Sequence, residues 1–332
     1  MKNTLHPVLL FNLALTAVSL VFVVFFETNA NAAPPAMVQE ASGVLRFESK
    51  LYLIGDDDPG AYYSLSIPET PGAFIHIRPE NLSRVFWPAA TLAIDLESIE
   101  RLADGRLVIL SEQLAALVCE AGVVAQYPGP LVKFGERGVE GLAVREVQGG
   151  VSRVAVLWEG GYPGSRHMGH EVRPHMGGRA LSPVVWVHDL DSGAQDVRIG
   201  RRNTIRSFAL DVPLPSGREP EAQRFRSPDL VWHKLGSEAR EEWGFIAILS
   251  SMNDTSPRKF AHHWLQRFDA QGNRVGEPYD LDERLPKAWH GLNWEGLDWF
   301  EEGKSLILMY EHDPEGELIV PIIELPRSWR AN

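Results

Sequence analysis

An acidic-hydrophobic unit occurs three times along this chain, and its repetition constrains the fold more than any other feature. Each copy begins with a carboxylate, a small residue and an aliphatic residue, and then runs through a turn into a β-rich stretch. The first carboxylates are Glu97, Glu140 and Glu295, and the β-rich stretches end on the second glutamates Glu112, Glu159 and Glu311. Repetition of one unit in a fixed order is typical of stacked or radial repeat folds.

A fourth, weaker copy, PDLVWHKL followed by WGFIAILSS, has Asp229 in the place of the first glutamate. Near the start, LYLIGDD aligns with LVILSE, which places Asp56 and Asp57 where Glu112 falls. The run after Glu112 contains two further strand-like segments, so each unit supplies four strands, the content of one propeller blade. We therefore predict an all-β fold, a single β-propeller of five or six four-stranded blades over residues 44–326. The sixth blade would have to come from residues 68–94.

Composition narrows the class of protein. The chain is 44% hydrophobic and 23% charged, which excludes a disordered chain, and no long segment has a 3.6-residue period. The net charge of −12 excludes nucleic-acid binding as the main function and favours a small molecule or a cation as the ligand.

The N-terminus is distinct from the repeats. An apolar run from Val8 to Phe26 follows Lys2, and Ala30-Asn31-Ala32 provides a cleavage site, so residues 1–32 are predicted to be a signal peptide. The run is also long enough to span a bilayer, which leaves an uncleaved membrane anchor as the alternative. Residues 33–43 are a flexible lead-in, and the folded part is expected to be periplasmic or secreted. The single cysteine, Cys119, excludes a disulfide framework and is expected to be buried in a strand.

The repeated acids predict a metal site. In a propeller the first strand of each blade lines the central channel, so equivalent acids converge there, and hard oxygen ligands suit Ca²⁺. The expected ligands are Glu97, Glu140, Asp229 and Glu295, surrounded by Asp57, Glu112, Glu159 and Glu311. In the alternative interpretation, each acid accepts hydrogen bonds from the backbone of the next blade and only joins the repeats.

A basic insertion separates the second and third strands of one blade. Residues 160–181 contain one acid among several arginines, histidines and glycines, and arginine forks bind phosphate or carboxylate. The expected substrate-binding residues are Arg166, His167, His170, Arg173 and His175; the alternative is a solvated surface loop. After the insertion, PVVWVHDLDSGAQDVRI is predicted to form a hairpin with an Asp-Ser-Gly turn.

The chain contains no G-x-S-x-G elbow, no P-loop and no Cys-x-x-Cys pair, so a serine-triad esterase has no support. The candidate catalytic residues are instead the channel acids Glu97, Glu140 and Glu295 together with His290. His290 precedes the last unit, on a loop of the kind that forms channel mouths. The alternative for His290 is packing against the next blade.

Four units in order resemble the bacterial β-propeller family named for the esterase-like activity of phytase. The similar segments are DLESI with DGRLVILSE, GVEGLAV with VAVLWEG, SPDLVWHKL with FIAILSS, and LNWEGLDW, within residues 45–325. Two positions depart from the family pattern: Ser250-Ser251 replaces an acidic-basic ending, and Ser98 replaces glycine after Glu97. The resemblance implies hydrolysis of phosphate or carboxyl esters.

The sequence therefore predicts an exported, metal-dependent hydrolase of an anionic ester, with a phosphoester as the expected substrate. The alternative is a non-catalytic propeller that binds a ligand or a partner protein. Ser250 distinguishes the two, because a catalytic ring of acids would need a replacement ligand near it.

Overall fold

The computed structural model divides the chain into two units, residues 1–36 and 37–332, and every residue that the structure describes lies in the second. The described residues are 38, 40–56, 58, 60–67, 72–87, 95–127, 138–159, 166–167, 170–171, 183–200, 203–212, 225–236, 242–252, 260–311 and 318–330. Within these ranges, none of the helices has the length and apolar character that crossing a membrane requires. The predicted signal peptide or anchor lies outside them.

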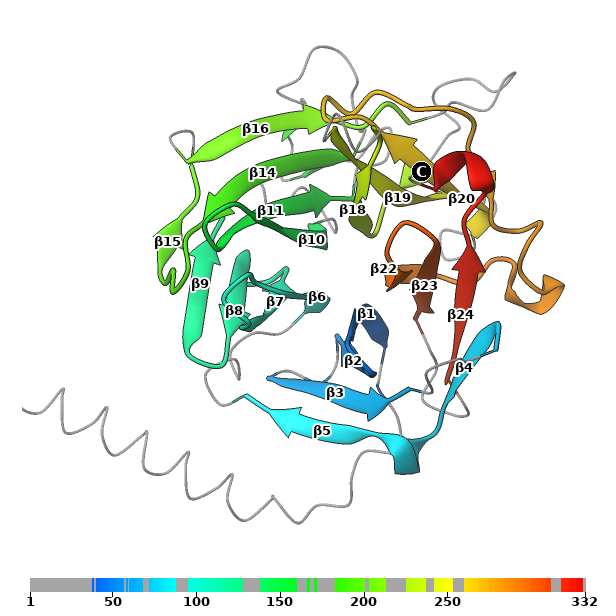
Figure 1. The fold of residues 1–332 in the computed structure, drawn as a ribbon, viewed down its shortest axis with the longest axis horizontal. Coiled ribbons are helices and arrows are strands. Elements are labelled where there is room, and N and C mark those ends of the chain that lie inside the picture. Colours follow the sequence, from blue (N-terminus) through cyan, green and yellow to red (C-terminus); the bar gives the residue numbers. More distant parts are fainter. Residues whose placement is uncertain are drawn as a thin grey trace, which may run out of the picture. The chain divides into compact units, whose positions relative to one another are not determined.

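Five sheets of four or five strands each are arranged as blades around a central axis (Figure 1), and all of their strand pairs but one are antiparallel. Blade 1 consists of β1 (Ala41–Phe47), β2 (Lys50–Gly55), β3 (Ala61–Ser66) and β5 (Ser83–Phe86). Blade 2 consists of β6 (Leu96–Arg101), β7 (Leu107–Ser111), β8 (Ala116–Cys119) and β9 (Gly122–Gln126). Blade 3 consists of β10 (Val139–Val147), β11 (Val151–Trp158), β14 (Val184–Leu190) and β16 (Thr204–Ala209).

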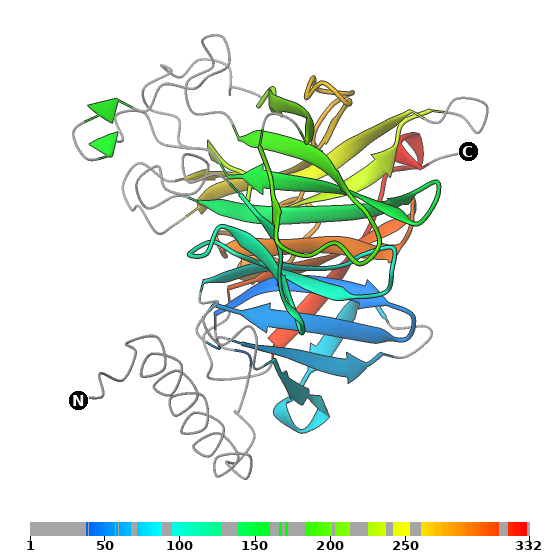
Figure 2. The ribbon, with the colours of Figure 1, turned by 90° about the vertical axis from the view of Figure 1, so that its left-hand side faces the viewer.

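Blade 4 is formed by β17 (Phe225–Arg226), β18 (Leu230–Lys234), β19 (Trp243–Met252), β20 (Phe260–Phe268) and β21 (Tyr279–Asp280). Blade 5 is formed by β22 (Trp294–Glu301), β23 (Ser305–Tyr310), β24 (Leu318–Glu324) and β4 (Phe74–Ile77). Short 3₁₀ turns lie at Pro79–Asn81, Lys287–Trp289 and Arg327–Trp329. Seen from the side, most strands of the blades run along the central axis (Figure 2).

The innermost strands form a closed ring. Strand β1 contacts β6 and β22, β10 contacts β6 and β18, and β18 contacts β22. The predicted propeller is therefore confirmed, with five blades. Residues 68–94 supply no sixth blade among the described residues, because β5 is the outer strand of blade 1 and β4 the outer strand of blade 5.

The ring closes through β4. This strand precedes β5 in sequence but leaves blade 1 and pairs antiparallel with β24 near the C-terminus, from Phe74 opposite Pro321 to Ile77 opposite Leu318. Blade 5 therefore contains strands from both ends of the propeller sequence. Such pairing protects a sheet edge that would otherwise be exposed.

The hydrophobic core is divided among the five blade interfaces. Continuous apolar runs such as LVILS are typical of strands buried on both faces, and here both faces of each blade pack on a neighbour. Each interface has its own buried cluster, represented by the pairs Ile54–Ile109, Leu110–Val156, Val187–Phe245, Ile248–Leu308 and Leu53–Ile307. Cys119 is buried at the end of β8, as expected.

The prediction of a hairpin after the insertion, over residues 183–199, is wrong. The Asp191–Gly193 turn forms, but β15 (Val197–Arg198) then pairs in parallel with β9 of blade 2, and β14 pairs with β16 instead. The backbone N–H of Asp196 already bonds to the Val123 carbonyl of blade 2. The open edge of blade 2 thus takes a fifth strand before the chain returns to blade 3.

Candidate functional site

Three of the repeated glutamates lie at β-bulges of the innermost strands. In blade 2, Leu96 pairs with Ser111 and Ser98 with Leu110, so Glu97 is the extra residue without a cross-strand partner. The same shift occurs at Glu140 and at Glu295. A bulge redirects the side chain of its extra residue, and here it turns three equivalent carboxylates toward one end of the channel. In blade 1 the bulged residue is Ser42.

The second set of acids also occupies one equivalent position. The backbone N–H of each acid bonds to the carbonyl of the residue two positions before the bulge. The four bonds are Asp56 to Glu40 at 3.1 Å, Glu112 to Asp95 at 2.9 Å, Glu159 to Gly138 at 3.4 Å and Glu311 to Asn293 at 2.8 Å. Asp56 is therefore the equivalent of Glu112, and Asp57 lies outside the described residues.

Blade 4 departs from this pattern. Ser250 pairs with Arg226, as Ser111 pairs with Leu96 in blade 2. Arg226 therefore occupies the position directly before the one that the bulged glutamates occupy in the other blades. The hydroxyl of Ser250 lies 2.9 Å from Nδ1 of His263, its partner on the neighbouring strand. Both side chains are buried.

Arg226 is surrounded by carboxylates from two neighbouring blades. Its Nη1 bonds to Asn293 Oδ1 at 2.9 Å and to Glu295 Oε1 at 3.0 Å. Its Nη2 bonds to Glu140 Oε2 at 2.9 Å and Glu295 Oε2 at 2.6 Å, and Nε lies 2.7 Å from Glu159 Oε2. The side chain is only 9% exposed, so one buried positive charge is shared by three glutamates. The pKa of the Arg226 guanidinium is raised well above its usual value by these partners, against the effect of burial.

Asp229 occupies a deeper level of the channel. Its Oδ1 accepts the backbone N–H groups of Leu142 at 3.2 Å and Leu230 at 2.9 Å, and its Oδ2 accepts that of Leu297 at 2.8 Å. These bonds join blade 4 to blades 3 and 5, which is the role expected under the alternative interpretation. Burial nevertheless raises the pKa of Asp229 well above the usual value.

Two further acids act like Asp229 at this level. Oδ2 of Asp298 accepts the backbone N–H of Arg46 at 2.5 Å, which joins blade 5 to blade 1. Oε1 of Glu100 accepts that of Val144 at 3.4 Å, which joins blade 2 to blade 3. The channel therefore has a deep level of acids that bond to backbone and an outer level of acids at one mouth.

The outer level has two unlike sides. On one side Arg226 compensates Glu140, Glu159 and Glu295. On the other side, the ligand atoms of Asp56, Asp95 and Glu97 lie within 4.8 Å of one another, and so do those of Glu97, Glu112 and Glu140. Among the described residues, no cation forms an ion pair with Asp56, Asp95 or Glu97.

Electrostatics on this second side favour a bound cation. Burial, with smaller contributions from Glu295, Asp95 and Glu40, raises the pKa of Asp56 to about 8, although a hydrogen bond from Ser42 opposes the shift. Burial and then the negative charge of Glu140 raise the pKa of Glu97 well above its usual value. Oδ1 of Asp56 is buried and accepts no hydrogen bond from the described residues. These oxygens fit a hard divalent cation such as Ca²⁺, whose charge would offset the repulsion.

The small residue after each glutamate lets the blades approach closely. A Cβ at Gly141 would lie 2.9 Å from Cα of Asp229, and one at Gly296 would lie 3.0 Å from the Ser42 carbonyl oxygen. Blade 2 has Ser98 at this position. Here the glycine that permits the close approach is Gly43 of blade 1, because a Cβ at Gly43 would lie 3.0 Å from Cα of Ser98. The departure at Ser98 therefore leaves the position of Glu97 unchanged.

The remaining predicted site residues divide into two groups. Nε2 of His290 lies 3.3 Å from the carbonyl oxygen of Leu285, within the segment that leads into β22. In the insertion, Arg166–His167 (β12) pairs with His170–Glu171 (β13), whereas the side chains of these residues, and all of Arg173 and His175, lie outside the described part. Trp158 pairs with Val184 across the insertion, and Glu159 contacts Arg226, so the described residues that flank the insertion lie at the acidic mouth.

Sequence reasoning missed Arg226. The residue belongs to the basic stretch 160–226, but nothing in the order of the repeats distinguishes it from the other arginines there. The available signal was weak: an arginine three residues before Asp229, in the one unit whose second strand ends in Ser250-Ser251 instead of an acid.

Comparisons with known proteins were made on sequence and on structure. No family model matches the chain, and no curated protein matches it. A thermostable family-43 glycoside hydrolase superposes with a TM-score of 0.44 at 10% identity, covering 89% of this chain and 93% of that one. A mutant α-L-arabinanase from Cellvibrio cellulosa superposes with a TM-score of 0.39 at 12% identity, covering 90% and 99%. Both scores lie below 0.5, so the fold assignment rests on the strand pairing itself.

Proposed function

We propose that the acidic mouth of the channel binds one divalent cation, Ca²⁺, and that the protein uses it to hydrolyse an anionic ester, specifically a phosphoester. The contrast between the two sides of the outer level carries this proposal. Arg226 already compensates one side, whereas Asp56, Asp95 and Glu97 converge without a described cationic partner. One cation bound there would compensate the negative charge of these three acids, as Arg226 compensates that of the acids on the other side.

The chain's own residues would divide the work. Asp56, Asp95, Glu97 and Glu112 would hold the ion, which when bound would polarise a phosphoryl oxygen and make bound water more acidic. Arg226 fixes the carboxylates of Glu140 and Glu295 in place. Burial raises the pKa of Glu295 to about 7, even though Arg226 opposes the shift, and that value suits a general acid or base near neutral pH.

An anionic substrate needs positive charge at an otherwise acidic mouth. The insertion 160–181 begins directly after Glu159, and it carries the arginines Arg166, Arg173 and Arg179. In this proposal Arg166 and Arg173 bind the substrate anion. The same proposal places the protein in the phytase-like family and, with residues 1–32 as a signal peptide, outside the cytoplasm.

The test is phosphate release from a panel of phosphomonoesters and phosphodiesters, with carboxyl esters in parallel. Chelated protein is compared with protein in excess Ca²⁺, using Glu97→Gln and the exposed Glu120→Gln as the matched control. We expect Ca²⁺-dependent release in the natural protein and in Glu120→Gln, and a loss of at least about a hundredfold in Glu97→Gln. Ca²⁺ should also stabilise the fold by ~2.7 kcal/mol at a hundredfold excess over Kd.

Two outcomes separate the alternatives. If Ca²⁺ raises the melting temperature but no ester in the panel is cleaved, the protein is a cation-binding propeller without this activity. If Ca²⁺ neither binds nor stabilises, the proposed metal centre is wrong.

A further inference from the structure

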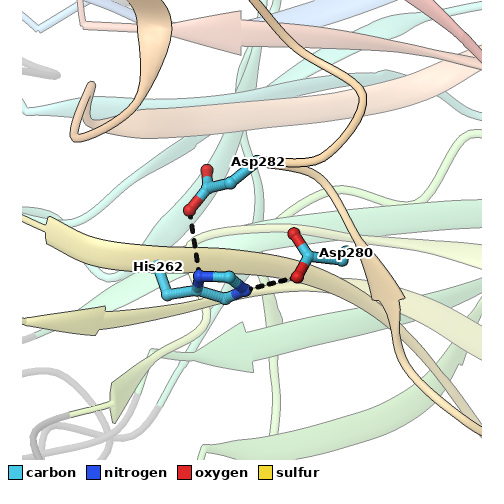
Figure 3. A group of neighbouring side chains, drawn as sticks. All are labelled: His262, Asp280 and Asp282. Atoms are coloured by element: carbon cyan, nitrogen blue, oxygen red, sulfur yellow. Dashed lines mark hydrogen bonds and ion pairs between the residues drawn. The ribbon is translucent and has the colours of Figure 1, made fainter. Parts of the chain in front are cut away.

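A second group of potential metal ligands lies on the outer part of blade 4, away from the channel acids. His262 on β20 faces two carboxylates, Asp280 at the end of β21 and Asp282 just beyond it (Figure 3). Nε2 of His262 lies 2.8 Å from Oδ2 of Asp280, and Nδ1 lies 3.1 Å from Oδ2 of Asp282. The three ligand atoms lie within 4.8 Å of one another.

A neutral His262 ring cannot satisfy both of its contacts. A neutral imidazole carries a proton on one ring nitrogen only, so one of the two carboxylates must face a lone pair. With Nε2–H donating to Asp280, the Nδ1 lone pair faces Asp282, and two acceptors meet with no charge between them. A cation resolves this conflict. A single proton would leave the group with a net negative charge, whereas a dication neutralises both carboxylates.

Asp282 offers a further ligand atom. Its Oδ1 is buried and accepts no hydrogen bond from the residues that the structure describes. A buried oxygen without a partner is costly unless something binds it.

The ligands are held in position before any ion binds. Oδ1 of Asp280 accepts the backbone N–H of Glu283 at 3.2 Å, and Asp280 pairs with Trp264 in the sheet. The His262 ring packs on the Trp264 ring, with centroids 4.5 Å apart. Side chains of His262 and Asp280 remain 34% and 29% exposed, so an ion can reach them from solvent.

We propose that His262, Asp280 and Asp282 form a second metal site, which takes a transition-metal dication of the Zn²⁺ class. An imidazole ligand suits Zn²⁺ and its neighbours, whereas the all-oxygen channel mouth suits Ca²⁺, so the two sites select different ions. Asp282 and one nitrogen of His262 bind the metal. Asp280 accepts the N–H of the other nitrogen and fixes the ring, an arrangement common around metal-bound histidines.

The site lies beside the irregular position of the propeller. His262 pairs with Ser251, which occupies the place of Glu112, Glu159 and Glu311 in the other blades. Blade 4 therefore lacks the acid at the end of its second strand and carries an acid-histidine group one strand farther out.

The experiment measures Zn²⁺ bound per chain by equilibrium dialysis of the full chain, first stripped with chelator and then held in excess Ca²⁺ to fill the channel mouth. Variants are His262→Gln and Asp282→Asn, with the exposed His76→Gln as the matched control and Glu97→Gln to report on the channel. Melting curves confirm that each variant folds. Co²⁺ serves as a second probe, because its visible absorption changes when an imidazole and carboxylates coordinate it.

We expect His262→Gln and Asp282→Asn each to bind one Zn²⁺ fewer than the natural protein and to lose the Co²⁺ spectrum of the site. His76→Gln and Glu97→Gln should keep both. Asp280→Asn should weaken Zn²⁺ binding by about 10-fold to 100-fold, the usual effect of removing an orienting carboxylate. Equal Zn²⁺ binding in the natural protein and His262→Gln would overturn the proposal, as would a His262 ring that keeps both N–H protons in NMR spectra recorded with Zn²⁺.

Discussion

The guanidinium of Arg226 meets the carboxylate of Glu295 end-on, with Nη1 3.0 Å from Oε1 and Nη2 2.6 Å from Oε2. The two residues belong to adjacent blades, on β17 and β22. Since Nη2 also reaches Glu140 of blade 3, one side chain links three consecutive blades at the mouth of the channel. Two-point pairs of this kind fix geometry as well as charge.

Replacement of Arg226 should be strongly destabilising. Arg226→Met leaves buried carboxylates without their cation, and removal of one partner of a buried ion pair costs about 3–5 kcal/mol. Urea unfolding in chelator measures this loss. The control is Arg274→Met, which breaks the pair between Arg274 and Asp211 on the surface and should cost less than about 1 kcal/mol. Similar losses in the two variants would show that the Arg226 cluster contributes no more than a surface pair.

Stability without metal should fall as the pH rises through the range set by Asp56. The pKa of this carboxyl is about 8 in the folded protein against an ordinary value of 3.8, so the folded state holds more protons than the unfolded state between these limits. The free energy of unfolding then decreases with rising pH, by at most about 1.4 kcal/mol per pH unit for this group.

Asp56→Asn isolates this contribution. In chelator the variant should gain stability relative to the natural protein as pH rises from about 4 to about 8. Excess Ca²⁺ should reverse the order, because the natural protein keeps its ligand. The measurement is the free energy of unfolding, from denaturation curves at a series of pH values. If it changed equally with pH in the two proteins, both with and without Ca²⁺, Asp56 would not be part of the site.

Asp229 should matter to stability and not to metal binding. Asp229→Ala leaves three buried backbone N–H groups of β10, β18 and β22 without an acceptor, and each costs about 1–3 kcal/mol. Asp269→Ala is the control, because Asp269 also accepts three hydrogen bonds, two from backbone N–H groups and one from the Asn273 side-chain amide, but in an exposed turn. A shift of melting temperature that is no larger for Asp229 than for Asp269 would contradict the role as a link between blades.

Shortening the insertion should separate substrate binding from folding. Trp158 and Val184 are paired neighbours across β11 and β14, so a Gly-Ser connection can replace residues 162–181 without moving either strand. Glu159 must be kept, because it contacts Arg226. We expect a nearly unchanged melting temperature and unchanged Ca²⁺ stabilisation, with loss of phosphoester cleavage. Full activity after the deletion would show that the insertion does not bind substrate.

The repeats made the fold predictable because each unit carries its own strand pattern and its own acid. The positions of Glu97, Glu140 and Glu295 followed from three copies of one motif, and the structure places all three at equivalent bulges. The register that makes Asp56 equivalent to Glu112 was also readable, because both follow a buried apolar run of the same length.

Features that depend on contacts between distant segments could not be predicted from the sequence. β15 pairs with β9 because the outer edge of blade 2 is open. The strand propensity of residues 184–198 does not distinguish this pairing from the predicted pairing with β14. Arg226 becomes central only when the bulges of blades 3 and 5 bring Glu140 and Glu295 to it. The cluster of His262 with Asp280 and Asp282 likewise depends on the pairing of β20 with β21.

The position of β4 in blade 5 has a consequence for the order of folding. Strand β4 is synthesised long before β24, its sheet partner among the described residues. Until β24 is made, β4 has no strand to pair with and blade 5 remains incomplete. Loop closure over so long a segment is slow relative to pairing of neighbouring strands. Blades 2 to 4 can therefore assemble before β24 is made, whereas closure of the ring waits for β24. A chain cut short before Leu318 would expose a strand edge prone to aggregation.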